Sequence, residues 1–250
     1  MAESQQTVFL YVPCQMDLFQ PETVMSTITV LERLGQFCHY DMNTTCCGRR
    51  FFAEGELQYA KNLSYQVIKT YTEYCELHRK KFPVVIPDSA CAGFMRNDFE
   101  IVLKNATIPA ELNNFVSNVY ELCHYIVKVL QITKLNNEFR HRVFYFKTCQ
   151  AHNNYFQTDA PEILLKNTSG LDFIADDKKN CCCGANGRFP MLNPAAAEKM
   201  SGEIVQRAYN QGAEYITSTD IHCLQMLDAY KQKHNVDIEI IHIADILKGE

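Results

Sequence analysis

Eight of the chain's twelve cysteines fall into two copies of one spacing pattern. Each copy has a single cysteine, then an adjacent cysteine pair followed by glycine, then a last single cysteine. The gap before the pair is 31 residues in one copy and 32 in the other, and the gap after it is 43 and 39. Core packing gives no reason for such a duplication, whereas soft metals prefer thiolate ligands. The pattern therefore predicts one metal site per half, formed by Cys14, Cys46, Cys47 and Cys91 and by Cys149, Cys182, Cys183 and Cys223.

The duplication also predicts the domain organisation. A chain of 250 residues divides into domains 1–137 and 138–250, each large enough for its own core. With 24 basic and 29 acidic side chains, the charge does not favour binding to nucleic acid or to an anionic membrane. No apolar run approaches the roughly 18 residues of a membrane-spanning helix.

The N-terminal residues are polar and lack the basic start and apolar stretch of a signal peptide. We therefore expect a cytoplasmic protein. In that reducing compartment the cysteines are expected as thiols or metal thiolates and not as structural disulfides.

The repeat extends to the predicted secondary structure. In each half a short apolar run typical of a buried strand ends at the first cysteine, and a helical stretch follows that stops at Gly35 or Gly170. Further strands alternate with helices, which indicates a parallel sheet covered by helices. The expected fold class is α/β, with two pseudo-symmetric halves, each a short, mostly parallel sheet flanked by helices, and a cysteine site at the carboxyl ends of the strands. The predicted strands are 8–13, 37–40, 83–86, 143–148, 171–175, 213–216 and 238–242, the longer helices are 57–81 and 195–210, and 107–137 shows helical periodicity before a linker at 134–137.

The cysteine pair bears on the choice of metal. Two neighbouring side chains in a strand-like loop point apart, so they suit two metal atoms of a cluster better than one tetrahedral zinc. The chain has neither the paired Cys-x-x-Cys of structural zinc sites nor the short cysteine run of ferredoxins. The cysteine pair therefore favours iron–sulfur clusters, and zinc remains the alternative.

The motifs as a set resemble the tandem CCG cysteine-rich domain family. That family includes the cysteine-rich subunit of heterodisulfide reductase, iron–sulfur subunits of glycolate and anaerobic glycerol-3-phosphate oxidation, and lactate-utilisation protein A, and the last is the most similar branch. The resemblance covers essentially the whole chain. The stretches that carry it are 13–21, 45–48, 89–96, 182–184, 212–214, 220–224 and 242–247.

The resemblance implies that the eight repeated cysteines bind iron–sulfur clusters, of the 4Fe–4S type and up to two in number. It also implies an electron-transfer role in the oxidation of L-lactate or a related 2-hydroxy acid to the 2-oxo acid. The chain would be a subunit of an oxidoreductase complex and not an enzyme alone, and its partners would be separate oxidoreductase subunits that include a ferredoxin-type iron–sulfur protein. The sequence itself has no Gly-x-Gly-x-x-Gly and no phosphate-loop motif.

The chain departs from the heterodisulfide reductase pattern near the last cysteine of each copy. Where that branch has Cys-x-x-Cys, this chain has Asp88 and Asp220 in the first position. These carboxylates are expected as nearby or secondary ligands, with proximity favoured because oxygen is a hard donor. Asp is also a common turn residue after a strand. Two alternatives stay open, namely cluster-based disulfide catalysis, which the missing cysteines disfavour, and a non-redox zinc-binding protein.

The remaining cysteines and two histidines are interpreted conservatively. Free thiols are often buried in cores, so the cysteines without a repeat partner are expected in the core, and a third cysteine next to the second pair is more often packing than a spare ligand. The histidine beside the last cysteine is expected to contact Asn or water and not to bind metal, and the one at the end of the last strand is expected to pack. These residues are Cys38, Cys75, Cys123, Cys181, His222 and His242.

Overall fold

The computed structural model describes residues 6–104, 108–155, 159–176, 178 and 181–249. The polar N-terminal residues 1–5 lie outside this range. The described chain forms two four-stranded sheets, one in each half, and every strand pair in both is parallel. The fold is therefore α/β with two pseudo-symmetric halves, as the sequence predicts.

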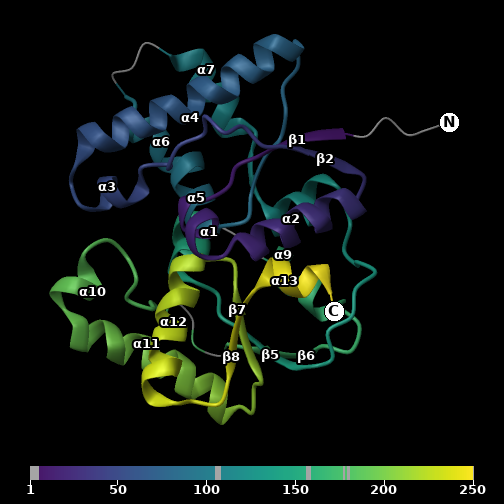
Figure 1. Cartoon of the computed structure of the whole chain (residues 1–250), viewed down its shortest axis with the longest axis vertical. Helices are drawn as coiled ribbons and strands as arrows, with labels where there is room; N and C mark the ends of the chain where they lie inside the picture. The colour runs from purple at the N-terminus through teal and green to yellow at the C-terminus, as the bar shows by residue number, and fades with distance from the viewer. Residues whose placement is uncertain (1–5, 105–107, 156–158, 177, 179–180, 250) are drawn as a thin grey trace.

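The first half, drawn in purple to teal in Figure 1, has the strand order β2-β1-β3-β4. Its first strand pairs with the second and third, so the cysteine stations after these strands share one edge of the sheet. The elements are β1 (Gln6–Leu10), α1 (Cys14–Phe19), α2 (Pro21–Arg33), β2 (Gln36–His39), α3 (Arg49–Ala53), α4 (Leu57–His78), β3 (Val84–Ile86), α5 (Ser89–Gly93), the π-helix η1 (Phe94–Asp98), α6 (Phe99–Val102), α7 (Pro109–Ser117), β4 (Val119–Glu121), α8 (Leu122–His124) and the π-helix η2 (Tyr125–Val129).

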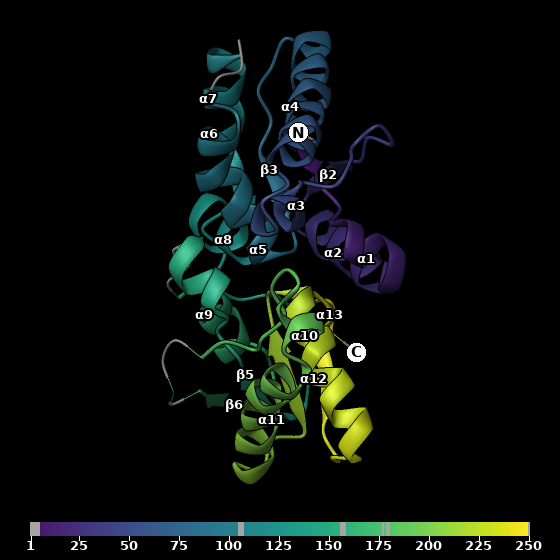
Figure 2. The same cartoon turned by 90° about the vertical axis from the view of Figure 1, so that its left-hand side faces the viewer.

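The second half repeats this topology with the order β6-β5-β7-β8. It occupies the lower part of the elongated molecule in Figure 2. Its elements are β5 (Arg142–Tyr145), the π-helix η3 (Gln150–Asn154), α9 (Ala160–Lys166), β6 (Asp172–Ala175), α10 (Phe189–Leu192), α11 (Pro194–Asn210), β7 (Tyr215–Ser218), α12 (Ile221–His234), β8 (Glu239–His242) and α13 (Ile243–Lys248).

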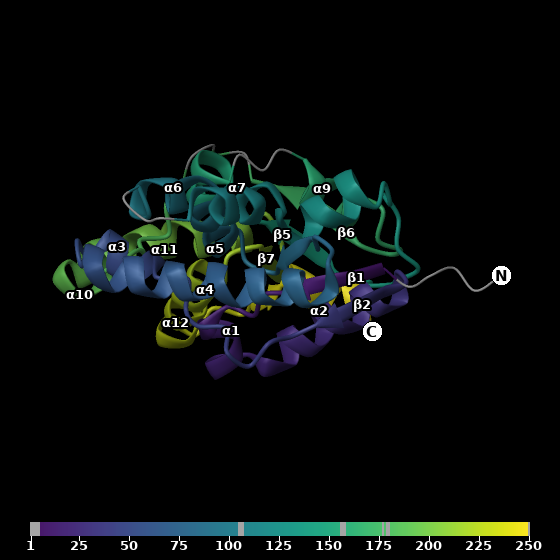
Figure 3. The same cartoon turned by 90° about the horizontal axis from the view of Figure 1, so that it is seen from above.

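Alternation along β1 sends its side chains into two different cores. Phe9 packs with Val67 and Tyr71 of α4 on the outer face of the first sheet. Val8 and Leu10 belong to a central core that also contains residues of the second half, from β5, α9 and α13. A third core lies between the second sheet and helices α11 and α12. The two halves therefore meet through a shared apolar layer. Figure 3 views the molecule along its long axis, with α6 and α7 on one side and α1 and α2 on the other.

Most expected elements are present with shifted ends, and two differences matter. The first half has a fourth strand, β4, inside the region for which the sequence suggests only helix and linker. Strand β7 covers Tyr215–Ser218 in place of the predicted 213–216. Its last residues, Thr217 and Ser218, are polar yet fully buried, so hydrophobicity does not mark them as strand. The division at residue 137 stays a prediction.

Candidate metal centres

The four repeated cysteines of the first half come together at the carboxyl ends of the strands. Cys14 opens α1, the pair Cys46 and Cys47 lies in the loop after β2, and Cys91 lies in α5 after β3. The Sγ atoms of Cys14 and Cys46 are 3.6 Å apart, and those of Cys47 and Cys91 are 3.5 Å apart. The two neighbouring thiols thus turn to different partners.

The second half has the same arrangement. Cys149, Cys182, Cys183 and Cys223 line one small cavity of about 20 Å³. The structure joins Cys183 to Cys223 by a disulfide, with Cα atoms 5.7 Å apart. The expectation of no disulfide is wrong at this pair, because the fold brings these two stations into contact, as it does Cys47 and Cys91. Metal binding by all four cysteines of the second half would need this disulfide reduced, because the thiolate is the metal ligand.

The glycine after each pair sets the loop geometry. Gly48 has a φ of 90°, and a Cβ there would lie 2.9 Å from the carbonyl oxygen of Ala60 on α4. Gly184 has a φ of 81°, and its Cβ would lie 3.0 Å from Cα of Ala197 on α11. Both N–H groups point back at a thiol, Gly48 to Cys46 at 3.5 Å and Gly184 to Cys182 at 3.4 Å. Only glycine combines this backbone conformation with this approach.

Hydrogen bonding biases one thiol of each site toward the thiolate. The bond from Cys14, then that from Cys47, holds the pKa of Cys46 far below its usual value against the opposing effect of burial. In the second half the bond from Cys149 lowers the pKa of Cys182 to about 6. The pKa values of Cys14 and Cys149 rise correspondingly, because each is the donor in its pair. Thiolates are the form that binds metal.

The two aspartates are helix caps next to the sites. Asp88 precedes α5 and its Oδ1 accepts from the backbone N–H of Cys91 at 2.7 Å. Asp220 precedes α12 and its Oδ1 accepts from the N–H groups of His222 and Cys223 at 3.0 and 3.2 Å. Both carboxylates are buried. Each aspartate is therefore both the turn residue after its strand and a neighbour of the last cysteine, because it caps the helix that carries that cysteine.

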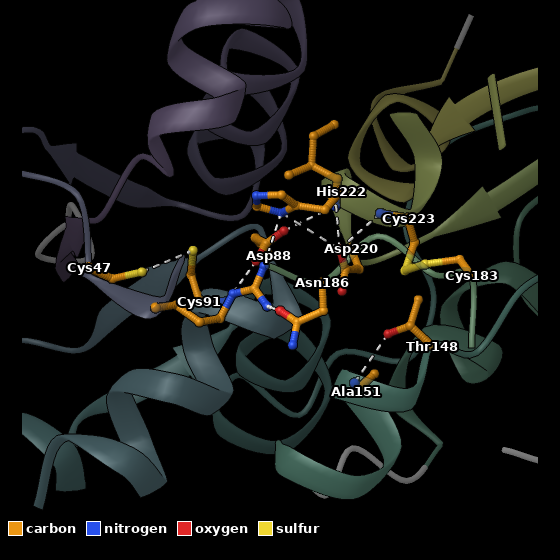
Figure 4. Close-up of polar contacts among 12 residues, drawn as sticks. Cys47, Asp88, Cys91, Thr148, Ala151, Cys183, Asn186, Asp220, His222 and Cys223 are labelled. Carbon is orange, nitrogen blue, oxygen red and sulfur yellow. Dashed lines mark hydrogen bonds and ion pairs between the residues drawn. A yellow bond between two sulfur atoms is a disulfide. The ribbon is translucent and has the colours of Figure 1, made fainter. Parts of the chain in front are cut away.

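A buried polar cluster lies between the two sites. Ligand atoms of Asp88, Asp220 and His222 all lie within 4.8 Å of one another. Figure 4 shows this cluster with Cys47 and Cys91 on one side and Cys183 and Cys223 on the other. Burial, then the nearby Asp88, raises the pKa of Asp220, against the effect of Arg49. Arg49 donates to Asn186 Oδ1 at 2.9 Å and contacts His222 Nδ1 at 3.4 Å.

Sequence reasoning missed Arg49 and Asn186. They are 137 residues apart, and only the fold shows that they meet. The sequence offers one local sign of Arg49, since a charged residue directly follows the first Cys-Cys-Gly, where the second copy has Ala185.

The remaining cysteines and histidines have other environments. Cys75 and Cys123 are buried in apolar cores, and Cys38 is half-buried against the central core. Cys181 Sγ accepts a hydrogen bond from Arg207 Nη2 at 3.7 Å. His242 is buried and caps α13 by accepting from the N–H of Ala244 at 3.1 Å.

The donor set fits a thiolate-ligated metal or cluster. Each half offers four cysteines and a glycine N–H that donates to sulfur, next to a capped helix end. The fold and the sites together define a class, a tandem α/β protein with one four-cysteine site per half. Among the described residues, no helix is both long and apolar enough to span a bilayer.

Comparison with known proteins agrees with this class. The model of the CCG cysteine-rich domain matches residues 8–96 and 143–228, and the chain belongs to this family. Lactate utilization protein A of Oceanobacillus iheyensis is 29% identical over 242 residues, which covers 96% of each chain. The protein of the same name from Shouchella clausii is 28% identical over 243 residues, 97% of this chain and 99% of the relative.

One solved structure shares the fold. A hypothetical protein from Helicobacter pylori superposes with a TM-score of 0.56 at 11% identity and covers 98% of this chain. The match spans 49% of that protein, so this chain is about half its length. At this identity the likeness shows the fold alone.

Proposed function

We propose that the chain is an iron–sulfur electron-transfer component of a complex that oxidises L-lactate, or a related 2-hydroxy acid, to the 2-oxo acid. One observation carries the proposal, the two four-cysteine sites in which the paired thiols face different partners, Cys46 toward Cys14 and Cys47 toward Cys91. Similarity to proteins named lactate utilization protein A supports the physiological setting.

In this proposal the eight cysteines hold up to two clusters of the 4Fe–4S type, which supply reversible one-electron storage when bound. The chain's own groups prepare the site. The N–H groups of Gly48 and Gly184 donate to sulfur and so stabilise its negative charge. Asp88 and Asp220 fix the helix starts that carry the last cysteine. Cys47, Cys91, Cys183 and Cys223 are buried, whereas the other four cysteines are partly exposed.

The oxidation of a 2-hydroxy acid releases two electrons and two protons, which need an acceptor for hydride or electrons. We assign that step to separate oxidoreductase subunits, including a ferredoxin-type iron–sulfur protein. The chain then acts as a subunit of an oxidoreductase and not as an enzyme alone. The carboxylates that replace the extra cysteines of the heterodisulfide reductase branch argue against disulfide catalysis by the isolated chain.

Anaerobic purification followed by iron, acid-labile sulfide and zinc analysis tests the proposal. We expect brown protein containing iron and sulfide. Cys46→Ser and Cys182→Ser should each remove about half of the iron, because each disrupts one of two sites. Cys38→Ser, a half-buried cysteine away from both sites, is the matched control and should retain all of it. Colourless protein with stoichiometric zinc and no sulfide would refute the redox role.

A further inference from the structure

Arg49 is an unusual buried cation. It is the only lysine or arginine with a buried side chain in the part of the chain that the structure describes. It follows Gly48 and begins α3, so the turn after the first cysteine pair fixes where its side chain starts. A buried guanidinium is costly unless anionic groups surround it. The surroundings of Arg49 therefore indicate what it does.

Those surroundings belong to both halves. Arg49 lines the cavity of the second-half cysteines, together with Cys149, Cys182 and Cys183. It donates to Asn186 Oδ1 at 2.9 Å, in the loop that follows the second Cys-Cys-Gly. A residue of the first half is thus part of the wall of the second-half site.

Charge explains why a cation is tolerated here. Burial opposes a charged side chain, but two buried aspartates and two cysteines near Arg49 favour its positive charge. They are Asp88 and Asp220 of the cluster between the sites, and Cys47 and Cys91 of the first site. Arg49 thus compensates negative charge on either side of the boundary between the halves.

The two copies of the motif differ at this position. Cys-Cys-Gly is followed by Arg49 in the first half and by Ala185 in the second. The second half has no guanidinium of its own at the equivalent place. A guanidinium from the first half lies instead in the wall of the second-half site.

We propose that Arg49 is a positioning residue shared by the two centres, which seats the 182–187 loop and whose positive charge raises the reduction potential of the second-half cluster. This role rests on the proposed function, because it presumes that the second site holds a redox-active cluster. Reduction adds negative charge to a cluster, and a nearby desolvated cation stabilises that charge.

The test isolates the second site. In a Cys46→Ser/Cys47→Ser background only the second-half cluster remains to be titrated anaerobically by EPR. Arg49→Gln in this background should shift the midpoint potential of the second-half cluster to more negative values. Arg49→Lys, which keeps the positive charge, should keep the potential close to that of the parent. Arg50→Gln is the matched control, because Arg50 is the next residue, is exposed and pairs with Glu54 at 3.1 Å. It should leave the potential unchanged.

The outcomes separate this inference from the proposed function. If the parent protein holds no iron and sulfide, the proposed function fails. If the parent is loaded and Arg49→Gln has an unchanged potential and full iron content, only the role of Arg49 is overturned. Should Arg49→Gln fail to fold, Asn186→Ala removes the anchor of the same guanidinium from the second-half side. A shift in the same direction supports the role, and no shift overturns it.

Discussion

Replacing Gly48 by alanine tests whether the Cys-Cys-Gly turn is dictated by sterics. The backbone at Gly48 has a φ of 90°, and an added Cβ would lie 2.9 Å from Ala60 O and 3.1 Å from Ala60 Cα. Backbone atoms of a helix cannot move aside as a flexible side chain can. Gly35 is a natural control, because its φ is 75° and nothing lies within 4 Å of its Cβ position.

The difference between the two substitutions can be worked out. A left-handed backbone costs an alanine roughly 1–2 kcal/mol, which is all that Gly35→Ala should lose. Overpacking adds about 1–3 kcal/mol at Gly48. We therefore expect a loss of about 2–5 kcal/mol for Gly48→Ala. In a chain of this size each kcal/mol lowers the melting temperature by about 2–4 °C.

Thermal and urea unfolding of the metal-free, reduced protein measure these losses. Relief of the clash also displaces the Gly48 N–H from Cys46. Gly48→Ala should for this reason bind less iron in the first site, whereas Gly35→Ala should bind a normal amount. If the two variants melt at the same temperature and bind equal iron, the steric argument is wrong.

The remaining predictions concern two buried carboxylates. Asp88→Ala leaves the buried N–H groups of Cys91 and Ile221 without their acceptor. Urea unfolding should therefore show that the free energy of unfolding falls by about 2–5 kcal/mol, and by less in Asp88→Asn. Equal losses in the two variants would contradict the capping role. Burial raises the pKa of Glu121 from 4.5 to about 7, so its stabilising effect is complete below pH 4.5 and is lost as the pH rises through 7. The free energy of unfolding of Glu121→Gln relative to wild type should therefore rise by about 3 kcal/mol as the pH is raised from 4.5 to 8. A difference that does not vary with pH would refute this reasoning.

The sequence predicts those parts of the fold that depend on local pattern. The strands that precede Cys14, Cys91 and Cys149 are apolar and short, and the left-handed glycines Gly35 and Gly170 mark where the following helical stretches end. Because all strands are parallel, their carboxyl ends share an edge, which places the cysteine stations together. Spacing and topology therefore go far toward locating both sites.

Features that depend on contacts between segments far apart in the sequence are not predictable in this way. Strand β4 has only three residues, Val119–Glu121, and is stabilised by parallel pairing with β3. The contact between Arg49 and Asn186 joins the two Cys-Cys-Gly loops across the interface. The central core mixes side chains of β1 and α2 with those of α9 and α13, so neither half shows a closed apolar pattern by itself.

The interface between the halves and the two cysteine sites are physically one region. The backbone N–H of Ser89 donates to the carbonyl oxygen of Thr219 at 2.8 Å, and the N–H of Ile221 donates to Asp88 Oδ2 at 3.0 Å. Asp88 and Thr219 lie between a third strand and the helix that carries a last cysteine, and Ser89 and Ile221 begin those helices. Separating the halves would exchange these hydrogen bonds for bonds to water, at a net cost of about 0.5–1.5 kcal/mol for each bond. The same bonds therefore hold the halves together and fix the starts of the helices that carry Cys91 and Cys223.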